Sequence, residues 1–171
     1  GHYPLGRGKF YDFIGINYYT RDIIQFEMNP AMMFGQLKVK ENSQVNDLGW
    51  EIYPEGIYRL SKKYHQRYKA PIYITENGIC DNEDDQRSRF IYNHLQQISR
   101  AIDEGKPIER YYHWSLLDNF EWLEGESARF GLVHINYQTQ ERTIKESGLF
   151  YGEICKKKAV TTDMINRYIR G

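Results

Sequence analysis

Three segments of the chain are rich in β-branched and aromatic residues, as buried β-strands are, and each of them stops at polar residues. They cover residues 11–19, 71–75 and 110–117. Short runs of this kind, bounded by turn residues, favour strands. Glu76, Asn77 and Gly78 directly follow the second run. The chain should therefore turn at Asn77 and Gly78 and leave the Glu76 carboxylate at the end of a strand.

Amphipathic helices are predicted between and after these strands. Apolar residues recur at helical spacing over 54–69 and over 86–104. The residues that repeat are Ile57, Leu60, Tyr64 and Tyr68 in the first segment, and Phe90, Ile91, Leu95, Ile98 and Ile102 in the second. Beyond them the pattern predicts a short strand or hairpin at 132–135, a turn at 138–141, and helices over 147–157 and 162–170.

Strands that alternate with helices indicate parallel βαβ units, so the predicted fold class is α/β. Residues 1–10 are expected to be a leader or loop, and 11–171 one unit. The segment 20–54 has few helix signals, and a loop of that length is usually a functional lid or disordered. The acidic run 81–85 is expected to be a solvated loop that caps the following helix.

Composition excludes several classes of partner. The chain has 171 residues, 23 basic and 23 acidic side chains, and a formal net charge of zero, which does not favour nucleic acid or a membrane surface. No apolar run approaches the roughly 18 residues of a membrane helix. Two cysteines form no disulfide framework, which favours a reducing, cytoplasmic location. No cofactor or metal is expected, because the histidines have no ligand spacing.

The residues at the strand ends suit carbohydrate chemistry. The chain has 15 Tyr, 8 Phe and 3 Trp. Most of these rings, Tyr18, Tyr111 and Tyr112 among them, are expected in the core, while a few near strand ends could lie against sugar rings. A carboxylate beside a Tyr hydroxyl could attack an anomeric carbon while a second carboxyl group protonates the leaving oxygen.

Three motifs make the interpretation specific. They are Asp-Phe-Ile-Gly-Ile-Asn-Tyr-Tyr-Thr at 12–20, Ile-Thr-Glu-Asn-Gly at 74–78 and Trp-Ser-Leu-Leu-Asp-Asn-Phe-Glu-Trp at 114–122. They closely resemble three signatures of glycoside hydrolase family 1, the β-glucosidase family. Arg-Phe-Gly-Leu-Val at 129–133 and Lys-Glu-Ser-Gly at 145–148 resemble its downstream segments in the right order. The resemblance covers nearly the whole chain from Tyr11 onward.

The resemblance implies a role for each matching residue. Glu76 matches the catalytic nucleophile, and Asn17 and Tyr19 match the residues that hold it. Four others match the sugar-binding positions: Trp114, Glu121, Trp122 and Phe130. The three strands correspond to strands six to eight, so the chain resembles the C-terminal part of a (β/α)₈ TIM barrel, shorter than the roughly 250 residues of a complete one.

The chain also departs from the family pattern. The family's acid/base lies in an Asn-Glu-Pro tripeptide, which is absent from this sequence. The resemblance therefore implies a fragment of a retaining β-glycosidase without its own acid/base. The 6-phospho branch has Ser, Lys and Tyr where this chain has Glu121, Ala128 and Phe130. Lacking that cation, the chain is expected to act on terminal unphosphorylated β-D-glycosides.

Two other interpretations remain open at this point. The chain could be an inactive structural half that needs an N-terminal half-barrel chain or forms a homo-oligomer, because an open parallel sheet exposes its edges and should be apolar on both faces. It could also be a non-catalytic carbohydrate-binding module. Hydrolysis, rather than binding alone, would separate the enzyme from both.

Overall fold

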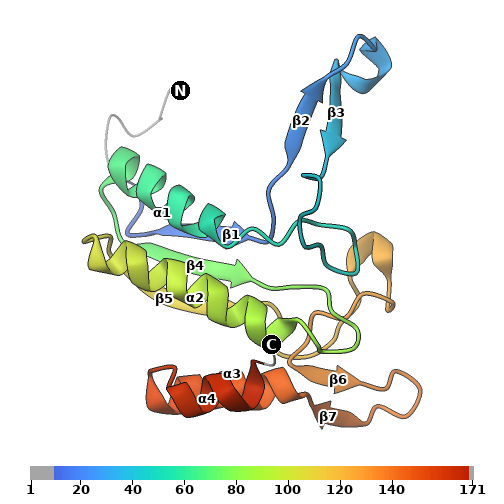
Figure 1. Cartoon of the computed structure of the whole chain (residues 1–171), viewed down its shortest axis with the longest axis vertical. Helices are drawn as coiled ribbons and strands as arrows, with labels where there is room; N and C mark the ends of the chain where they lie inside the picture. Colours follow the sequence, from blue (N-terminus) through green and yellow to red (C-terminus); the bar gives the residue numbers. More distant parts are fainter. Residues whose placement is uncertain (1–9, 170–171) are drawn as a thin grey trace.

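The fold is built on a parallel sheet with the strand order β1-β4-β5. The computed structural model describes residues 10–169. The strands are β1 (Ile14–Tyr18), β4 (Ile72–Asn77) and β5 (Ile108–His113), and they alternate with helices α1 (Glu55–Tyr68) and α2 (Arg87–Asp103). Both helices lie along the same side of the sheet (Figure 1). The predicted βαβ order is confirmed.

The sheet has one apolar face and one polar face. Ile16, Ile72 and Ile74 pack against residues of α1 and α2 in the main hydrophobic cluster. The opposite face carries half-buried Tyr73 and Thr75 and exposed Arg110 and Tyr112. The expectation that both faces are apolar is therefore wrong for this second face. The expectation that Tyr112 lies in the core is also wrong, because its side chain is 48% exposed.

The third strand ends earlier than its composition predicts. β5 stops at His113, and residues 114–117 turn away from the sheet to meet a different segment. The Ser115 amide donates to the Phe130 carbonyl at 3.1 Å, and Leu117 pairs with Val133. Residues 114–131 thus form a long loop whose two ends lie side by side.

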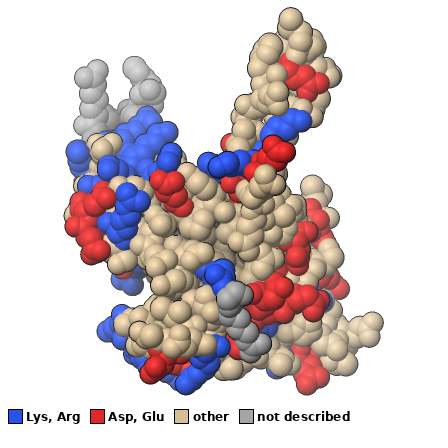
Figure 2. Space-filling view, in the orientation of Figure 1, with Lys and Arg blue, Asp and Glu red and all other residues tan. Residues whose placement is uncertain are grey.

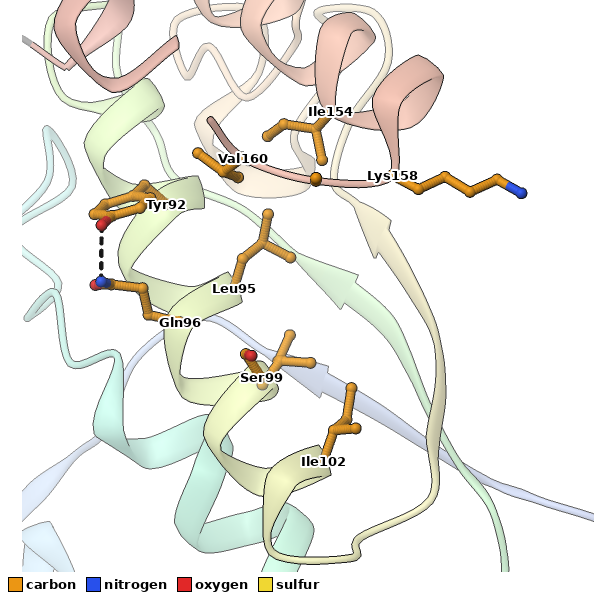
Figure 3. Close-up of a pocket in the computed structure, with 10 residues that line it drawn as sticks. Tyr92, Leu95, Gln96, Ser99, Ile102, Ile154, Lys158 and Val160 are labelled. Carbon is orange, nitrogen blue, oxygen red and sulfur yellow. Dashed lines mark hydrogen bonds between the residues drawn. The ribbon is translucent and has the colours of Figure 1, made fainter. Parts of the chain in front are cut away.

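The C-terminal part adds a small hairpin and two helices. Strands β6 (Val133–Ile135) and β7 (Arg142–Ile144) pair antiparallel, and helices α3 (Glu146–Lys157) and α4 (Thr162–Tyr168) follow. The hairpin was one of the two forms predicted for this region, although β7 itself was not predicted. A shallow apolar groove of about 400 Å³ lies between α2 and the connection from α3 to α4 (Figure 3).

The segment expected to be a lid or disordered contains an ordered hairpin. Strands β2 (Ile23–Phe26) and β3 (Gly35–Lys38) pair antiparallel around the 3₁₀ turn η1 (Pro30–Met32), and they project away from the sheet (Figure 1). The hairpin exposes many apolar side chains, and its surface is mostly uncharged in Figure 2. Within residues 10–169, no helix has both the length and the apolar character needed to cross a membrane.

The acidic run caps α2 as expected, and Asn82, Glu83 and Asp85 are exposed, but Asp81 departs from the expectation. Asp81 is only 1% exposed and is not solvated. Its carboxylate accepts hydrogen bonds from the backbone amides of Asp85, Gln86 and Arg87 at 3.3, 3.0 and 2.8 Å. Asp81 therefore caps the start of α2 from inside the protein, because these amides have no partner within the helix. The expected leader, 1–10, lies almost wholly outside the described residues.

Candidate active site

Glu76 lies at the carboxyl end of β4, where a β-bulge changes the direction of its side chain. Ile16 pairs with Ile74, and the next pair is Asn17 with Glu76, so Thr75 is the extra residue. Strict alternation from Ile72 and Ile74 would turn Glu76 toward the helices. The bulge instead leaves Thr75 and Glu76 both half-buried, with Glu76 facing a cleft. Bulges next to active sites commonly redirect a side chain in this way.

The cleft has a volume of about 310 Å³ and is mainly aromatic. It is lined by Tyr19, Trp50, Glu76, Trp114, Glu121, Trp122 and Phe130. The Tyr19 ring meets the rings of Trp50 and Phe130 edge-on, with centroids 6.3 and 6.1 Å apart. These contacts fix the aromatic wall beside the carboxylate.

A short hydrogen bond joins Tyr19 to Glu76. The Tyr19 hydroxyl donates to Glu76 Oε2 at 2.6 Å. Burial, this hydrogen bond, and the charges of Glu76 and Glu121 raise the pKa of Tyr19 above its usual value. The phenol therefore keeps its proton at neutral and mildly alkaline pH, and it remains a donor to the carboxylate.

Asn77 and Gly78 hold the end of β4 in place, and neither acts mainly as a turn residue. Asn77 is the last residue of β4 and is fully buried. Its side chain donates to the Tyr18 carbonyl at 2.7 Å and accepts from the Tyr111 hydroxyl at 2.9 Å, which links all three strands. A Cβ on Gly78 would lie 1.8 Å from the Trp114 carbonyl oxygen, so only glycine allows this close approach.

The structure brings together six of the seven residues predicted for the site. Asn17 is the exception, since it does not line the cleft and its Oδ1 accepts from the Thr75 hydroxyl at 2.6 Å. Phe130 is only 2% exposed and supports the wall, whereas Trp122 is 85% exposed at the rim. The catalytic and sugar-binding roles of all seven stay predictions.

Sequence reasoning missed Trp50. This ring lines the cleft, yet it comes from the segment 20–54 that was expected to be a lid or disordered. Its only signal is a large aromatic residue after Leu48 and Gly49 in an otherwise polar loop. Among residues 10–169, no group of three or more His, Cys, Asp or Glu side chains could hold a metal ion.

A parallel α/β sheet with a carboxylate in an aromatic cleft at its carboxyl edge is the arrangement found in barrel enzymes that act on sugars. The family model of Glycosyl hydrolase family 1 matches residues 7–160. The chain belongs to glycosyl hydrolase family 1, as its motifs predicted.

Individual relatives agree with this assignment. The chain is 40% identical over 161 residues to the β-galactosidase of Saccharolobus solfataricus, covering 90% of this chain and 33% of that protein. It is 40% identical over 160 residues to β-glucosidase A of Thermotoga maritima, covering 87% and 35%. The solved β-glycosidase from Pyrococcus horikoshii matches with a TM-score of 0.84 at 43% identity, covering 94% of this chain and 38% of that one.

The chain spans about a third of the length of these curated relatives. Its fold is accordingly part of a (β/α)₈ barrel, which confirms the predicted fold class.

Proposed function

We propose that this chain supplies the attacking carboxylate and part of the sugar-binding cleft of a retaining β-glycosidase. The observation that carries the proposal is the 2.6 Å hydrogen bond from Tyr19 to Glu76 inside the aromatic cleft. Glu76 attacks the anomeric carbon and forms a covalent glycosyl ester. The Tyr19 hydroxyl keeps one carboxylate oxygen fixed, so that the other is free to attack.

The remaining residues of the cleft bind the sugar. The Trp114 ring offers an apolar face to the C–H groups of the sugar, and Phe130 supports the wall next to it. The Glu121 carboxylate accepts two hydroxyl hydrogen bonds at once, which sets the orientation of the ring. Trp122, at the rim, closes over the same hydroxyl groups. Trp50 extends the aromatic wall on the side of Tyr19.

The charge of the cleft supports an unphosphorylated substrate. Its lining includes two carboxylates, Glu76 and Glu121, and no basic side chain among the described residues. Ala128, which stands where the 6-phospho branch has Lys, is uncharged and is buried against Cys80 and Phe130. A phosphate group would therefore meet negative charge without compensation. The ratio of kcat/KM for an aryl β-glucoside to that for its 6-phosphate tests this, and a ratio below one would contradict it.

The proton donor is proposed to come from outside these 171 residues, from an N-terminal half-barrel. Retaining hydrolysis needs a second carboxyl group about 5–5.5 Å from the first. The only other carboxylate of the described cleft, Glu121, is assigned here to sugar binding. Because general acid–base catalysis contributes typically 10²–10⁴-fold, this chain alone should hydrolyse an aryl β-glucoside slower than a complete relative by at least that factor, so that its hydrolysis is negligible.

Covalent labelling tests the assignment of Glu76. The chain joined to the preceding barrel strands of a relative is treated with a 2-deoxy-2-fluoro-β-glucoside, and the labelled peptide is identified by mass spectrometry. We expect the label on Glu76 and none on the Glu76→Gln variant. The matched control, Glu153→Gln, removes a carboxylate that is held by Lys157 and Arg167 on the helices, and it should still be labelled.

Two outcomes would contradict the proposal. A label on another carboxylate would assign the nucleophile elsewhere. Sugar binding without labelling, equal in the parent protein and in Glu76→Gln, would instead identify a carbohydrate-binding module.

A further inference from the structure

The loop from Asp118 to Gly131 carries Glu121 and Trp122 but has little support of its own. Its only regular element is the three-residue 3₁₀ turn η2 (Trp122–Glu124). Phe120, Trp122 and Leu123 are all highly exposed. The backbone hydrogen bonds of residues 121–127 stay within the loop. The position of Glu121 over the cleft therefore depends on how the two ends of the loop are held.

Both ends meet at one buried carboxylate. The Asp118 side chain is fully buried. Its Oδ1 accepts from the Gly131 amide at 2.9 Å and from Lys145 Nζ at 3.1 Å. Its Oδ2 accepts from Arg129 Nη1 and from the Ile135 amide, both at 3.4 Å. Asp118 is the first residue of the loop, and Arg129 and Gly131 belong to its other end.

His134 also faces this carboxylate, with its Nδ1 3.5 Å from Asp118 Oδ2. The imidazole is about half exposed, so water can replace this contact. Gly131 cannot be replaced by a larger residue without a shift of the backbone, because a Cβ there would lie 2.1 Å from the Asp118 amide nitrogen. The two ends of the loop are in direct backbone contact.

Arg129 connects this anchor to the segment that follows Glu76. Its carbonyl accepts from the Asp81 amide at 3.0 Å and from the guanidinium of buried Arg87 at 2.9 Å. Its own amide donates to the Asn82 side chain at 3.2 Å. The loop is thereby tied to residues 81–87, the continuation of β4. A shift of Asp118 would move Glu121 relative to Glu76.

We propose that Asp118 is a positioning residue that holds Glu121 and Trp122 in register with Glu76. The effect on catalysis rests on the proposed function, whereas the effect of Asp118 on the position of the loop does not. A neutral Asn at 118 can accept with one atom only, so it loses the bonds that Oδ2 makes with Arg129 and Ile135. It also leaves the buried Lys145 ammonium without a charged partner.

Hydrogen exchange on the 171-residue chain itself tests whether Asp118 holds the loop in place. In Asp118→Asn we expect the amides of 119–135 to exchange at least about tenfold faster, while amides of β1, β4 and α1 stay unchanged. Glu153→Gln is the matched control, because it also removes one partnered carboxylate, and it should leave 119–135 unchanged. Lys145→Met, which keeps the apolar stem of the side chain, should give a smaller increase in the same segment.

Substrate discrimination tests the consequence. Glu121 is proposed to contact the 6-hydroxyl, because the 6-phospho branch differs at this position. In the chain joined to the preceding barrel strands, the preference for a β-glucoside over its 6-deoxy analogue should therefore fall at least about fivefold in Asp118→Asn, where Glu121 is displaced. A loss of general stability would lower both rates equally and leave this ratio unchanged.

Each result has a distinct meaning. Unchanged exchange in 119–135, or faster exchange spread evenly over the chain, would overturn the positioning role, whatever residue is labelled by the fluoroglucoside. An unchanged substrate ratio in a variant whose loop exchanges faster would overturn the link to Glu121. A label away from Glu76 would refute the proposed function and leave the exchange result valid.

Discussion

Replacing Tyr19 with Phe removes a single hydroxyl from the candidate site and should slow one chemical step more than the other. The hydroxyl donates to Glu76 Oε2 at 2.6 Å. In the free protein Glu76 is a carboxylate, and in the glycosyl ester it is neutral. The hydrogen bond therefore weakens as the ester forms and strengthens again as the ester breaks and charge returns to the oxygen.

The size of the effect follows from this change in charge. Hydrogen bonds to charged groups contribute about 1.5–3 kcal/mol. The half-buried position of both side chains favours the lower end. If roughly half of the charge has returned in the transition state for breakdown, the Phe variant loses about 1 kcal/mol there, or about fivefold in rate. Loss of this hydrogen bond does not slow formation of the ester, because charge leaves Glu76 in that step.

The two steps can be measured separately with a 2-fluoro-glucoside, which forms the ester quickly and releases it slowly. The rate of labelling and the rate of reactivation are compared between Tyr19→Phe and the unaltered protein. Tyr18→Phe is the matched control, because its hydroxyl donates to the Tyr53 carbonyl at 2.5 Å and not to Glu76. Equal slowing of both steps in Tyr19→Phe, or no change in reactivation, would refute the reasoning.

Three further predictions concern other parts of the chain. Glu121→Gln should lower kcat/KM for a β-glucoside about 10- to 100-fold, in line with the loss of a charged hydrogen bond, and a deoxy analogue without the contacted hydroxyl should lose much less. Gly78→Ala places a Cβ 1.8 Å from the Trp114 carbonyl and should reduce the unfolding free energy by about 1–3 kcal/mol in urea titrations, whereas Gly152→Ala, with open space around it in α3, should raise it by about 0.5–1 kcal/mol. Burial lowers the pKa of His94 from 6.5 to about 4, so the unfolded state gains a proton first as the pH falls, and between those values this group alone should cost the chain about 3 kcal/mol of stability. Burial also lowers the pKa of His113, to about 3, so His94→Leu should reduce the pH dependence of unfolding curves across this range by about the His94 share and leave that of His113.

The parts of the fold that the sequence predicted are those whose signal is local. The helices at 55–68 and 87–103 carry their apolar stripes in consecutive turns, and the structure matches both within about two residues. The hairpin of β2 and β3 was not predicted. Its strands leave their side chains largely exposed on both faces, so they show no alternation of apolar and polar positions that could signal a strand.

The contacts that hold the site depend on residues far apart in sequence. Asp118 forms an ion pair with Lys145, and the Asp81 amide donates to the Arg129 carbonyl. No regular spacing along the chain predicts either contact. Trp50 enters the cleft for the same reason, since the path of the loop that carries it is set by tertiary contacts. The Asp47 amide, for example, donates to the Cys80 carbonyl, and the Asp47 side chain accepts from the Asn82 amide. Residue type indicated carbohydrate chemistry, but only the fold determines which rings meet.

The bulge at Thr75 explains why a residue in an alternating strand can serve the site at all. Ile72 and Ile74 must face the helices, because they form the core between the sheet and α1 and α2. In a regular strand that requirement would bury Glu76 in the same apolar layer, where an unpaired carboxylate is strongly disfavoured. The extra residue lets the strand fill the core and still present Glu76 to the cleft. The core side of β4 ends at Ile74, and Glu76 turns to Tyr19. Asn77 then returns to the buried side and links the three strands. The close approach of Gly78 to Trp114 then brings the Trp114 ring, one residue beyond the end of β5, to the same edge, so the geometry of the site follows from the register of the sheet.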